Sequence, residues 1–129
     1  MTERLIEIAK EARAFAFAPF SRFKVGAAIL TQSGKIFTGC NIESASYGLT
    51  VCAERVAIWK AISEGSHDFV ALAIVADTDA LTPPCGACRQ IIWEFCGNID
   101  ILLANLDYKQ ETLKMEELLP KPFGSSFLE

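Results

Sequence analysis

Three cysteines at the predicted starts of two helices constrain the fold of this chain more than any other feature of its sequence. Cys85 and Cys88 lie three residues apart at the start of a helix predicted over residues 85–96, so their side chains share one face. Cys52 lies on the first turn of an earlier predicted helix. The residues between Cys52 and Cys85 have room for one helix, one strand and one loop, a unit that returns the second helix start to the side of the first. We therefore expect the three sulfur atoms to converge.

Converging thiolates form a soft, electron-rich pocket that suits zinc. Helix N-termini favour the thiolate over the thiol, because their free N–H groups and positive dipole stabilise negative charge. Structural zinc sites have four protein ligands, whereas catalytic sites usually have three and leave one position for water. The candidates for a fourth ligand are Cys40, Cys96 and His67, and none has zinc-finger spacing to the other three cysteines. We therefore predict a zinc site with an open position; a redox pair formed by Cys85 and Cys88 alone is the alternative.

Two charged residues, Glu54 and Arg55, follow Cys52 closely enough in the sequence to lie beside a bound zinc ion. Three thiolates around one Zn²⁺ leave a net negative charge, which makes the ion a poor Lewis acid. Arg55 is the nearest cation in the sequence, and its guanidinium can donate hydrogen bonds to the thiolates. Glu54 lies in an apolar helix start, where burial raises the pKa of a carboxyl group toward the range useful for proton transfer near neutral pH. We interpret Glu54 as a proton carrier and Arg55 as the partner of the thiolates.

The pattern of apolar residues predicts an α/β fold with three layers, α-β-α, and a mixed central sheet. Helix and strand alternate in the middle of the chain, which implies a sheet covered by helices on both faces. At 129 residues and 51% hydrophobic composition, the chain can bury a core as one domain over residues 1–129. The predicted helices cover residues 3–17 with Thr2 as cap, 51–65 with Thr50 as cap, 85–96 and a turn at 115–119. The predicted strands cover residues 25–30, 35–38, 69–76 and 101–104, and a turn is expected at 105–110.

Charge and cysteine usage exclude several classes of partner. The formal net charge of −4 leaves no basic face for a long nucleic acid, although a single nucleoside carries no phosphate and is not excluded. No run of 18 uncharged apolar residues exists, and charged residues interrupt the N-terminal segment, so we expect neither a membrane span nor a signal peptide. Five cysteines, an odd number, are typical of reduced thiols in the cytoplasm.

The cysteine motifs carry a resemblance to a known family. Cys52-Ala53-Glu54 followed by Pro84-Cys85-Gly86-Ala87-Cys88 resembles the zinc-dependent cytidine deaminase superfamily. Residues 20–28, 38–48 and 88–90 narrow the resemblance to the small deaminases of free nucleosides, which use three cysteines and assemble as homotetramers. The resemblance runs from the first predicted helix to about Phe123, and Phe20 stands where that family often has tyrosine.

This resemblance implies both a reaction and a set of site residues. The expected reaction is the zinc-dependent hydrolysis of cytidine and 2′-deoxycytidine to uridine and 2′-deoxyuridine with release of ammonia, a step of pyrimidine salvage. By the resemblance, one zinc ion per subunit is held by Cys52, Cys85 and Cys88, with Glu54 as proton shuttle and Arg55 beside the thiolates. The residues implied to bind substrate are Asn41 and Glu43 at the ribose 3′-hydroxyl, Phe23 on the base, the backbone of Ala53 at the pyrimidine, and Tyr47 and Phe123 near subunit contacts.

Two other functions remain as alternatives at this stage. A deaminase of a related substrate, such as a nucleoside antibiotic of the blasticidin type, would share the zinc motifs but would not need the Asn41-x-Glu43 pair. A binding module with a structural zinc site and no enzymatic activity would need four protein ligands instead of three.

Overall fold

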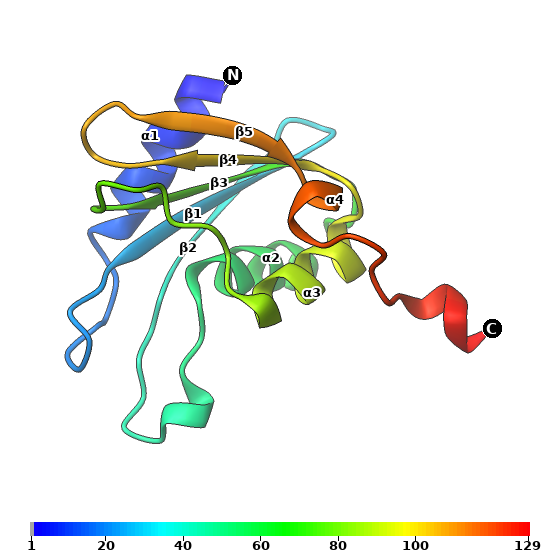
Figure 1. Cartoon of the computed structure of the whole chain (residues 1–129), viewed down its shortest axis with the longest axis horizontal. Coiled ribbons are helices and arrows are strands. Elements are labelled where there is room, and N and C mark those ends of the chain that lie inside the picture. The colour runs from blue at the N-terminus through cyan, green and yellow to red at the C-terminus, as the bar shows by residue number, and fades with distance from the viewer. Residues whose placement is uncertain (1) are drawn as a thin grey trace.

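The computed structural model describes residues 2–129 and contains a mixed sheet of five strands in the order β2-β1-β3-β4-β5 (Figure 1). Strand β1 pairs in antiparallel fashion with both β2 and β3, β3 is parallel to β4, and β4 is antiparallel to β5. The strands are β1 (Val25–Thr31), β2 (Ile36–Cys40), β3 (Phe69–Ala76), β4 (Asp100–Ala104) and β5 (Gln110–Lys114). The predicted mixed sheet is confirmed.

Helices cover both faces of this sheet, so the predicted three-layer arrangement is also confirmed. Helix α1 (Thr2–Arg13) packs on one face through Leu5 and Ala9, which belong to one of two buried apolar clusters. Helices α2 (Ala53–Ser63) and α3 (Gly86–Cys96) pack on the other face and share the second, larger cluster (Figure 1). Three shorter helical segments complete the chain: η1 (Tyr47–Leu49), α4 (Met115–Leu118) and η2 (Ser125–Leu128).

The long N-terminal helix predicted over residues 3–17 is wrong at its C-terminal end. Helix α1 ends at Arg13, and the next residues turn to bring Phe17 beside the segment after β2. There the N–H of Phe17 donates to the carbonyl of Asn41 at 3.0 Å, and the N–H of Glu43 donates to the carbonyl of Phe17 at 2.8 Å. Tertiary pairing with this segment therefore overrides the helical spacing of the apolar residues.

Two other predictions need correction. Helix α2 is capped by Cys52 and not by Thr50, because Val51 pairs with Ile42 through two backbone hydrogen bonds of 3.0 Å and is held in extended conformation. Strand β5 was not predicted at all. Its residues are mostly polar and exposed, since β5 is an edge strand of which only Leu113 packs toward the core, so the sequence has little apolar alternation there.

Within residues 2–129, no helix has the length and apolar character needed to cross a membrane.

Glycine at position 39 lets helix α2 lie directly against strand β2. A Cβ atom at Gly39 would come within 2.3 Å of the carbonyl oxygen of Ala53 and 2.5 Å of the amide nitrogen of Ala57. Both neighbours are backbone atoms of α2, so no side chain can move aside to make room. The position of Gly39 therefore sets the distance of the helix that begins with Cys52 from the sheet.

We expect Gly39→Ala to lower the free energy of unfolding by about 1–3 kcal/mol, because the added methyl group forces α2 away from β2. Gly48→Ala is the matched control, since a Cβ atom at Gly48 would meet nothing within 4 Å. Thermal and denaturant unfolding of both variants measure the difference. Equal stability of the two variants would contradict this role for Gly39.

Candidate metal centre and substrate cavity

Helices α2 and α3 each begin with a cysteine at the N-cap position, and these two ends meet. Cys52 caps α2, and Cys85 caps α3 by accepting a hydrogen bond from the N–H of Cys88 at 3.4 Å. The Sγ atoms of Cys52 and Cys85 are 3.9 Å apart, and all three sulfur atoms lie within 4.8 Å of one another. Among residues 2–129, no other group of histidine, cysteine or acidic side chains gathers in this way. The structure therefore brings together the three cysteines that the sequence predicted to converge.

The geometry and chemistry of this cluster fit zinc. Zn–S bonds of about 2.3 Å in a tetrahedral arrangement place sulfur atoms about 3.8 Å apart, close to the separation of Cys52 and Cys85. Hydrogen bonds from Cys88, Arg55 and Cys85 lower the pKa of Cys52 to about 5. The hydrogen bond to Cys52 and burial raise the pKa of Cys88. A divalent soft cation satisfies the same electron-rich atoms.

None of the candidates for a fourth ligand joins the cluster. Cys40 ends strand β2, Cys96 ends helix α3, and His67 lines a separate depression with Asp68 and Lys35. Desolvation by burial raises the pKa of Cys96 to about 12, which is typical of a small apolar residue and not of a metal ligand. In the part of the chain that the structure describes, the cluster thus offers three side chains that can bind a metal ion.

Arg55 contacts the cluster as the sequence predicted. Its Nη2 donates a hydrogen bond to Cys52 Sγ at 3.4 Å, and this bond raises the pKa of Arg55. The Nε atom of Arg55 is buried and has no hydrogen-bond partner among residues 2–129. The guanidinium therefore places positive charge beside the sulfur atom of Cys52.

Glu54 is buried beside the sulfur atoms, with only 4% of its surface exposed. Desolvation by burial raises the pKa of its carboxyl group to about 7, and the negative charge of Cys52 acts in the same direction. A carboxyl group with this pKa can both accept and release a proton near neutral pH. Glu54 thus lies buried on the first turn of α2, where the sequence analysis expected an acid in an apolar environment.

A cavity of about 220 Å³ opens in front of Glu54 and the cysteines. Its walls combine apolar side chains with a few polar groups, as is usual for sites that bind small molecules. The lining residues are Phe23, Val25, Asn41, Thr50, Val51, Cys52, Ala53, Glu54, Ile74, Thr82, Pro83 and Cys85. Of the residues expected at the substrate, Phe23, Asn41 and Ala53 therefore lie at one cavity with the metal centre.

About half of this lining was not predicted from the sequence. Val25 and Ile74 appear in the sequence only as strand residues, and nothing in an apolar run shows which strand end borders a cavity. Thr82 and Pro83 could have been predicted from the sequence, because they lie shortly before Cys85 in the loop that follows strand β3. Their position between a strand end and a helix start was the signal available.

Asn41 holds the segment that carries Phe23. Its Oδ1 accepts a hydrogen bond from the N–H of Val25 at 2.9 Å, and its Nδ2 donates to the carbonyl of Phe23 at 2.7 Å. Both ends of the amide are therefore engaged by backbone on the rim of the cavity. Asn41 orders this rim in addition to lining the cavity.

Glu43 lies at a neighbouring depression and not at the cavity itself. Its carboxylate accepts hydrogen bonds from the N–H groups of Phe20 and Ser21, at 2.9 and 3.1 Å, and from the hydroxyl of Ser21. The hydroxyl of Ser21 contributes most to lowering the pKa of Glu43. Thr50 borders both the cavity and the depression, so the two are adjacent.

Tyr47 and Phe123 do not reach the cavity of their own chain. Tyr47 lies in η1 with 77% of its surface exposed, and its ring contacts Phe20 edge to face. Phe123 lies before η2, where its ring stacks on Phe127 and its carbonyl accepts a hydrogen bond from Gln90. Figure 1 shows both segments, teal and red, extending away from the sheet and helices.

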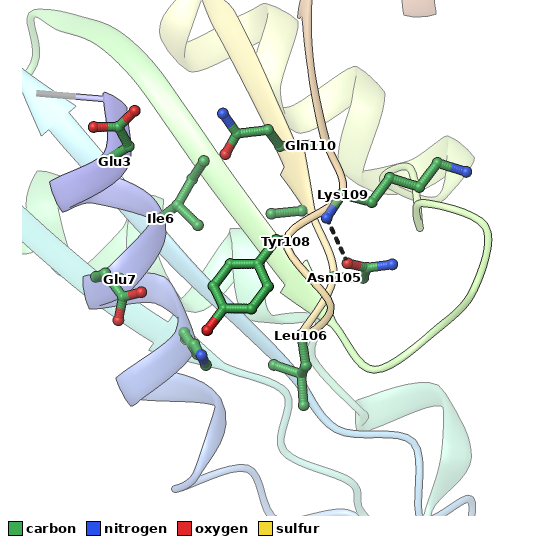
Figure 2. Close-up of a pocket in the computed structure, with 10 residues that line it drawn as sticks. Glu3, Ile6, Glu7, Asn105, Leu106, Tyr108, Lys109 and Gln110 are labelled. Atoms are coloured by element: carbon green, nitrogen blue, oxygen red, sulfur yellow. Dashed lines mark hydrogen bonds between the residues drawn. The ribbon is translucent and has the colours of Figure 1, made fainter.

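A second cavity, of about 360 Å³, lies between α1 and the turn that joins β4 to β5 (Figure 2). Tyr108 points from this turn toward the helix residue Glu7, and the N–H of Lys109 donates to Asn105 Oδ1 at 3.0 Å. Because α1 covers the opposite face of the sheet from α2 and α3, this cavity is separate from the cysteines. It plays no part in the metal centre.

Comparison with known proteins gives consistent matches over nearly the whole chain. Residues 1–102 match the family described as the cytidine and deoxycytidylate deaminase zinc-binding region. A cytidine deaminase of Sporosarcina psychrophila is 49% identical over 127 residues, covering 98% of this chain and 93% of the relative. A cytidine deaminase of Halalkalibacterium halodurans is 51% identical over 122 residues, covering 94% and 92%. The crystal structure of cytidine deaminase from Burkholderia pseudomallei superimposes with a TM-score of 0.93 at 44% identity, covering 95% of this chain and 99% of the other.

A blasticidin-S deaminase of Bacillus cereus is also similar, at 32% identity over 124 residues, covering 90% of this chain and 87% of the relative. This identity is lower than the 49% and 51% of the cytidine deaminases from Sporosarcina psychrophila and Halalkalibacterium halodurans.

We expect Cys85→Ser to reduce the zinc content of the purified protein while the fold is retained. Serine is a favoured N-cap residue, so helix α3 keeps its start, but a hydroxyl is a far poorer zinc ligand than a thiolate. Cys96→Ala, which removes a thiol outside the cluster, is the matched control and should keep full zinc content. Metal analysis by mass spectrometry and circular dichroism check both variants, and full zinc content in Cys85→Ser would contradict the assignment.

Proposed function

The chain belongs to the cytidine and deoxycytidylate deaminase zinc-binding family, and from this premise we propose that it hydrolyses cytidine and 2′-deoxycytidine to the corresponding uridines with release of ammonia. One observation carries the proposal. A buried carboxyl group with a pKa raised to about 7 lies in a small cavity beside three sulfur atoms suited to zinc. This arrangement supplies a proton carrier and a place for a Lewis acid at one end of a cavity with an aromatic wall.

Cys52, Cys85 and Cys88 hold one zinc ion per subunit in this proposal. When bound, the ion supplies Lewis acidity that makes water a nucleophile near neutral pH. Arg55 offsets part of the negative charge of the three thiolates through its bond to Cys52, which preserves that acidity.

Glu54 moves the protons of the reaction. Its carboxylate accepts a proton from the attacking water and delivers it to N3 of the base while oxygen adds to C4. The carboxylate then accepts the proton of the new C4 hydroxyl and passes it to the amino group, and ammonia leaves as the C4–N bond breaks and the C4 carbonyl forms. Burial suits Glu54 to this role, because a carboxyl group with a pKa of about 7 is ionised and protonated in comparable proportions near neutral pH.

The other cavity residues position the nucleoside. Phe23 offers an aromatic face to the flat base, and the backbone of Ala53 orients the pyrimidine ring. Asn41 and Glu43 bind the ribose 3′-hydroxyl, since both carry oxygen atoms that accept hydrogen bonds. The adjacency of the Glu43 depression to the cavity, across Thr50, supports this assignment.

The identity of 49% and 51% to two cytidine deaminases, against 32% to a blasticidin-S deaminase, favours the simple nucleosides as substrates. We further propose that the chain acts as one deaminase domain in pyrimidine salvage. Its five free cysteines suit a reducing compartment such as the cytoplasm.

We expect the purified zinc protein to convert cytidine and 2′-deoxycytidine in an ultraviolet assay. Blasticidin S is tested separately in the same assay as the alternative substrate. Glu54→Gln should retain zinc and fold but lower kcat by on the order of 10²–10⁴, because it removes the proton carrier. Glu64→Gln, an exposed carboxylate at the C-cap of the same helix, is the control and should turn over like wild type. Turnover of blasticidin S alone, or full activity in Glu54→Gln, would overturn the proposal.

The active form in this proposal is a homotetramer in which neighbouring copies complete each cavity. Large apolar side chains are exposed around the loop after α1 and the segment after β2, and a monomer rarely leaves so many on one side. They are Phe15, Phe17, Phe20, Ile42, Tyr47 and Leu49. Tyr47 and Phe123, which lie outside the cavity of their own chain, then close the cavity of a neighbour.

We expect light scattering to give four times the mass of one chain. Tyr47→Ala should lower activity although this ring does not reach its own cavity, and Glu54→Gln abolishes the proton carrier of its own chain. Mixed oligomers of the two variants should therefore regain activity at those cavities that combine an intact Glu54 with an intact neighbouring Tyr47. A monomeric mass, or mixtures no more active than the separate variants, would contradict the shared cavity.

A further inference from the structure

Trp59 lies one helical turn after Arg55 on α2, and its ring covers the guanidinium of Arg55. The Cζ atom of Arg55 is 5.9 Å from the centroid of the Trp59 ring, within the range of a cation–π interaction. Residues four apart on a helix are neighbours, and helical side chains lean toward the N-terminus. The ring of Trp59 therefore extends back over the turn that carries Arg55 and, beyond it, Cys52.

Few other contacts fix the direction of the Arg55 side chain. Its Nη2 reaches Cys52 Sγ at 3.4 Å, while its buried Nε has no hydrogen-bond partner among residues 2–129. In that part of the chain the one ion pair joins Lys114 and Asp100, so no carboxylate holds the guanidinium. A long arginine side chain loses considerable rotamer entropy when it is held in one place, and the contacts that order Arg55 include the sulfur atom of Cys52 and the ring of Trp59.

We infer that Trp59 is a positioning residue of the metal centre, whose ring holds the guanidinium of Arg55 against Cys52. This inference rests on the proposed zinc site. It extends that site by one residue, because Trp59 acts through its contact with Arg55. When the guanidinium stays at Cys52, its positive charge offsets the charge of three thiolates around the ion, and the bound metal is retained more tightly.

The test is the zinc dissociation constant, measured by competition with a chromophoric chelator at fixed pH. Trp59→Leu, which keeps an apolar side chain but removes the aromatic face, should weaken zinc binding roughly twofold to fivefold. Trp59→Phe, which keeps an aromatic face, should bind close to wild type. Phe95→Leu is the matched control, because Phe95 is an aromatic residue on α3 of similar exposure, 40% against 44% for Trp59, and should not change zinc binding.

A double-mutant cycle separates positioning from packing. Arg55→Ala should itself weaken zinc binding, and Trp59→Leu should add nothing in the Arg55→Ala background, because the ring then has no cation to hold. Thermal unfolding checks that all variants fold. If Trp59→Leu does not fold, Trp59→Gln takes its place.

Each result decides the inference. Wild-type affinity in Trp59→Leu, or an equal loss in the presence and absence of Arg55, would overturn it while leaving the zinc site intact. Failure of the wild-type protein to bind zinc would overturn the proposed function together with this inference.

Discussion

The meeting of two helix N-termini is the constraint on which the rest of this structure depends. Cys52 and Cys85 are N-cap residues of α2 and α3, and their sulfur atoms come within 3.9 Å because these two helices pack side by side on one face of the sheet. The parallel pairing of β3 with β4 requires a crossover, and α3 is that crossover. Gly39 brings the backbone of α2 close to β2 on the same face. The convergence of these cysteines therefore follows from the order and direction of the strands and from the packing of the two helices on the sheet.

The negative charge at the two helix N-termini explains the electrostatic properties of Arg55 and Glu54. Three sulfur atoms gather negative charge at two helix ends whose dipoles favour it, and Arg55 adds a fixed positive charge on one side. Glu54 is buried beside the same charge, which Arg55 offsets only in part. Burial and the nearby Cys52 therefore raise its pKa to about 7, which keeps a proton available where the cavity opens. Residues next to each other in the sequence thus have opposite electrostatic roles, because they point to different surroundings on the first turn of α2.

The cavity walls come from segments that are held in place by side chain to backbone hydrogen bonds. Asn41 bonds to the backbone of Phe23 and Val25, and Glu43 bonds to the backbone of Phe20 and Ser21. The loop between α1 and β1, which lacks regular structure, is thereby ordered at the rim. Tyr47 and Phe123 are exposed and do not line the cavity.

Several features of the protein were determined by the sequence alone. The N-terminal cysteines of α2 and α3, the acid next to Cys52 and strand β3 were all predictable, because cap positions, motif spacing and apolar runs are local properties of the chain. Edge strand β5 and the early end of α1 were not, since the first has almost no apolar alternation and the second results from pairing of Phe17 with Ile42. Only the tertiary structure decided that Ile74 and Thr82 line the cavity, that Glu43 lies beside it, and that Trp59 covers Arg55. These relations depend on how strands, loops and helix faces are oriented around a common space, and that orientation is set by packing between residues distant in the sequence.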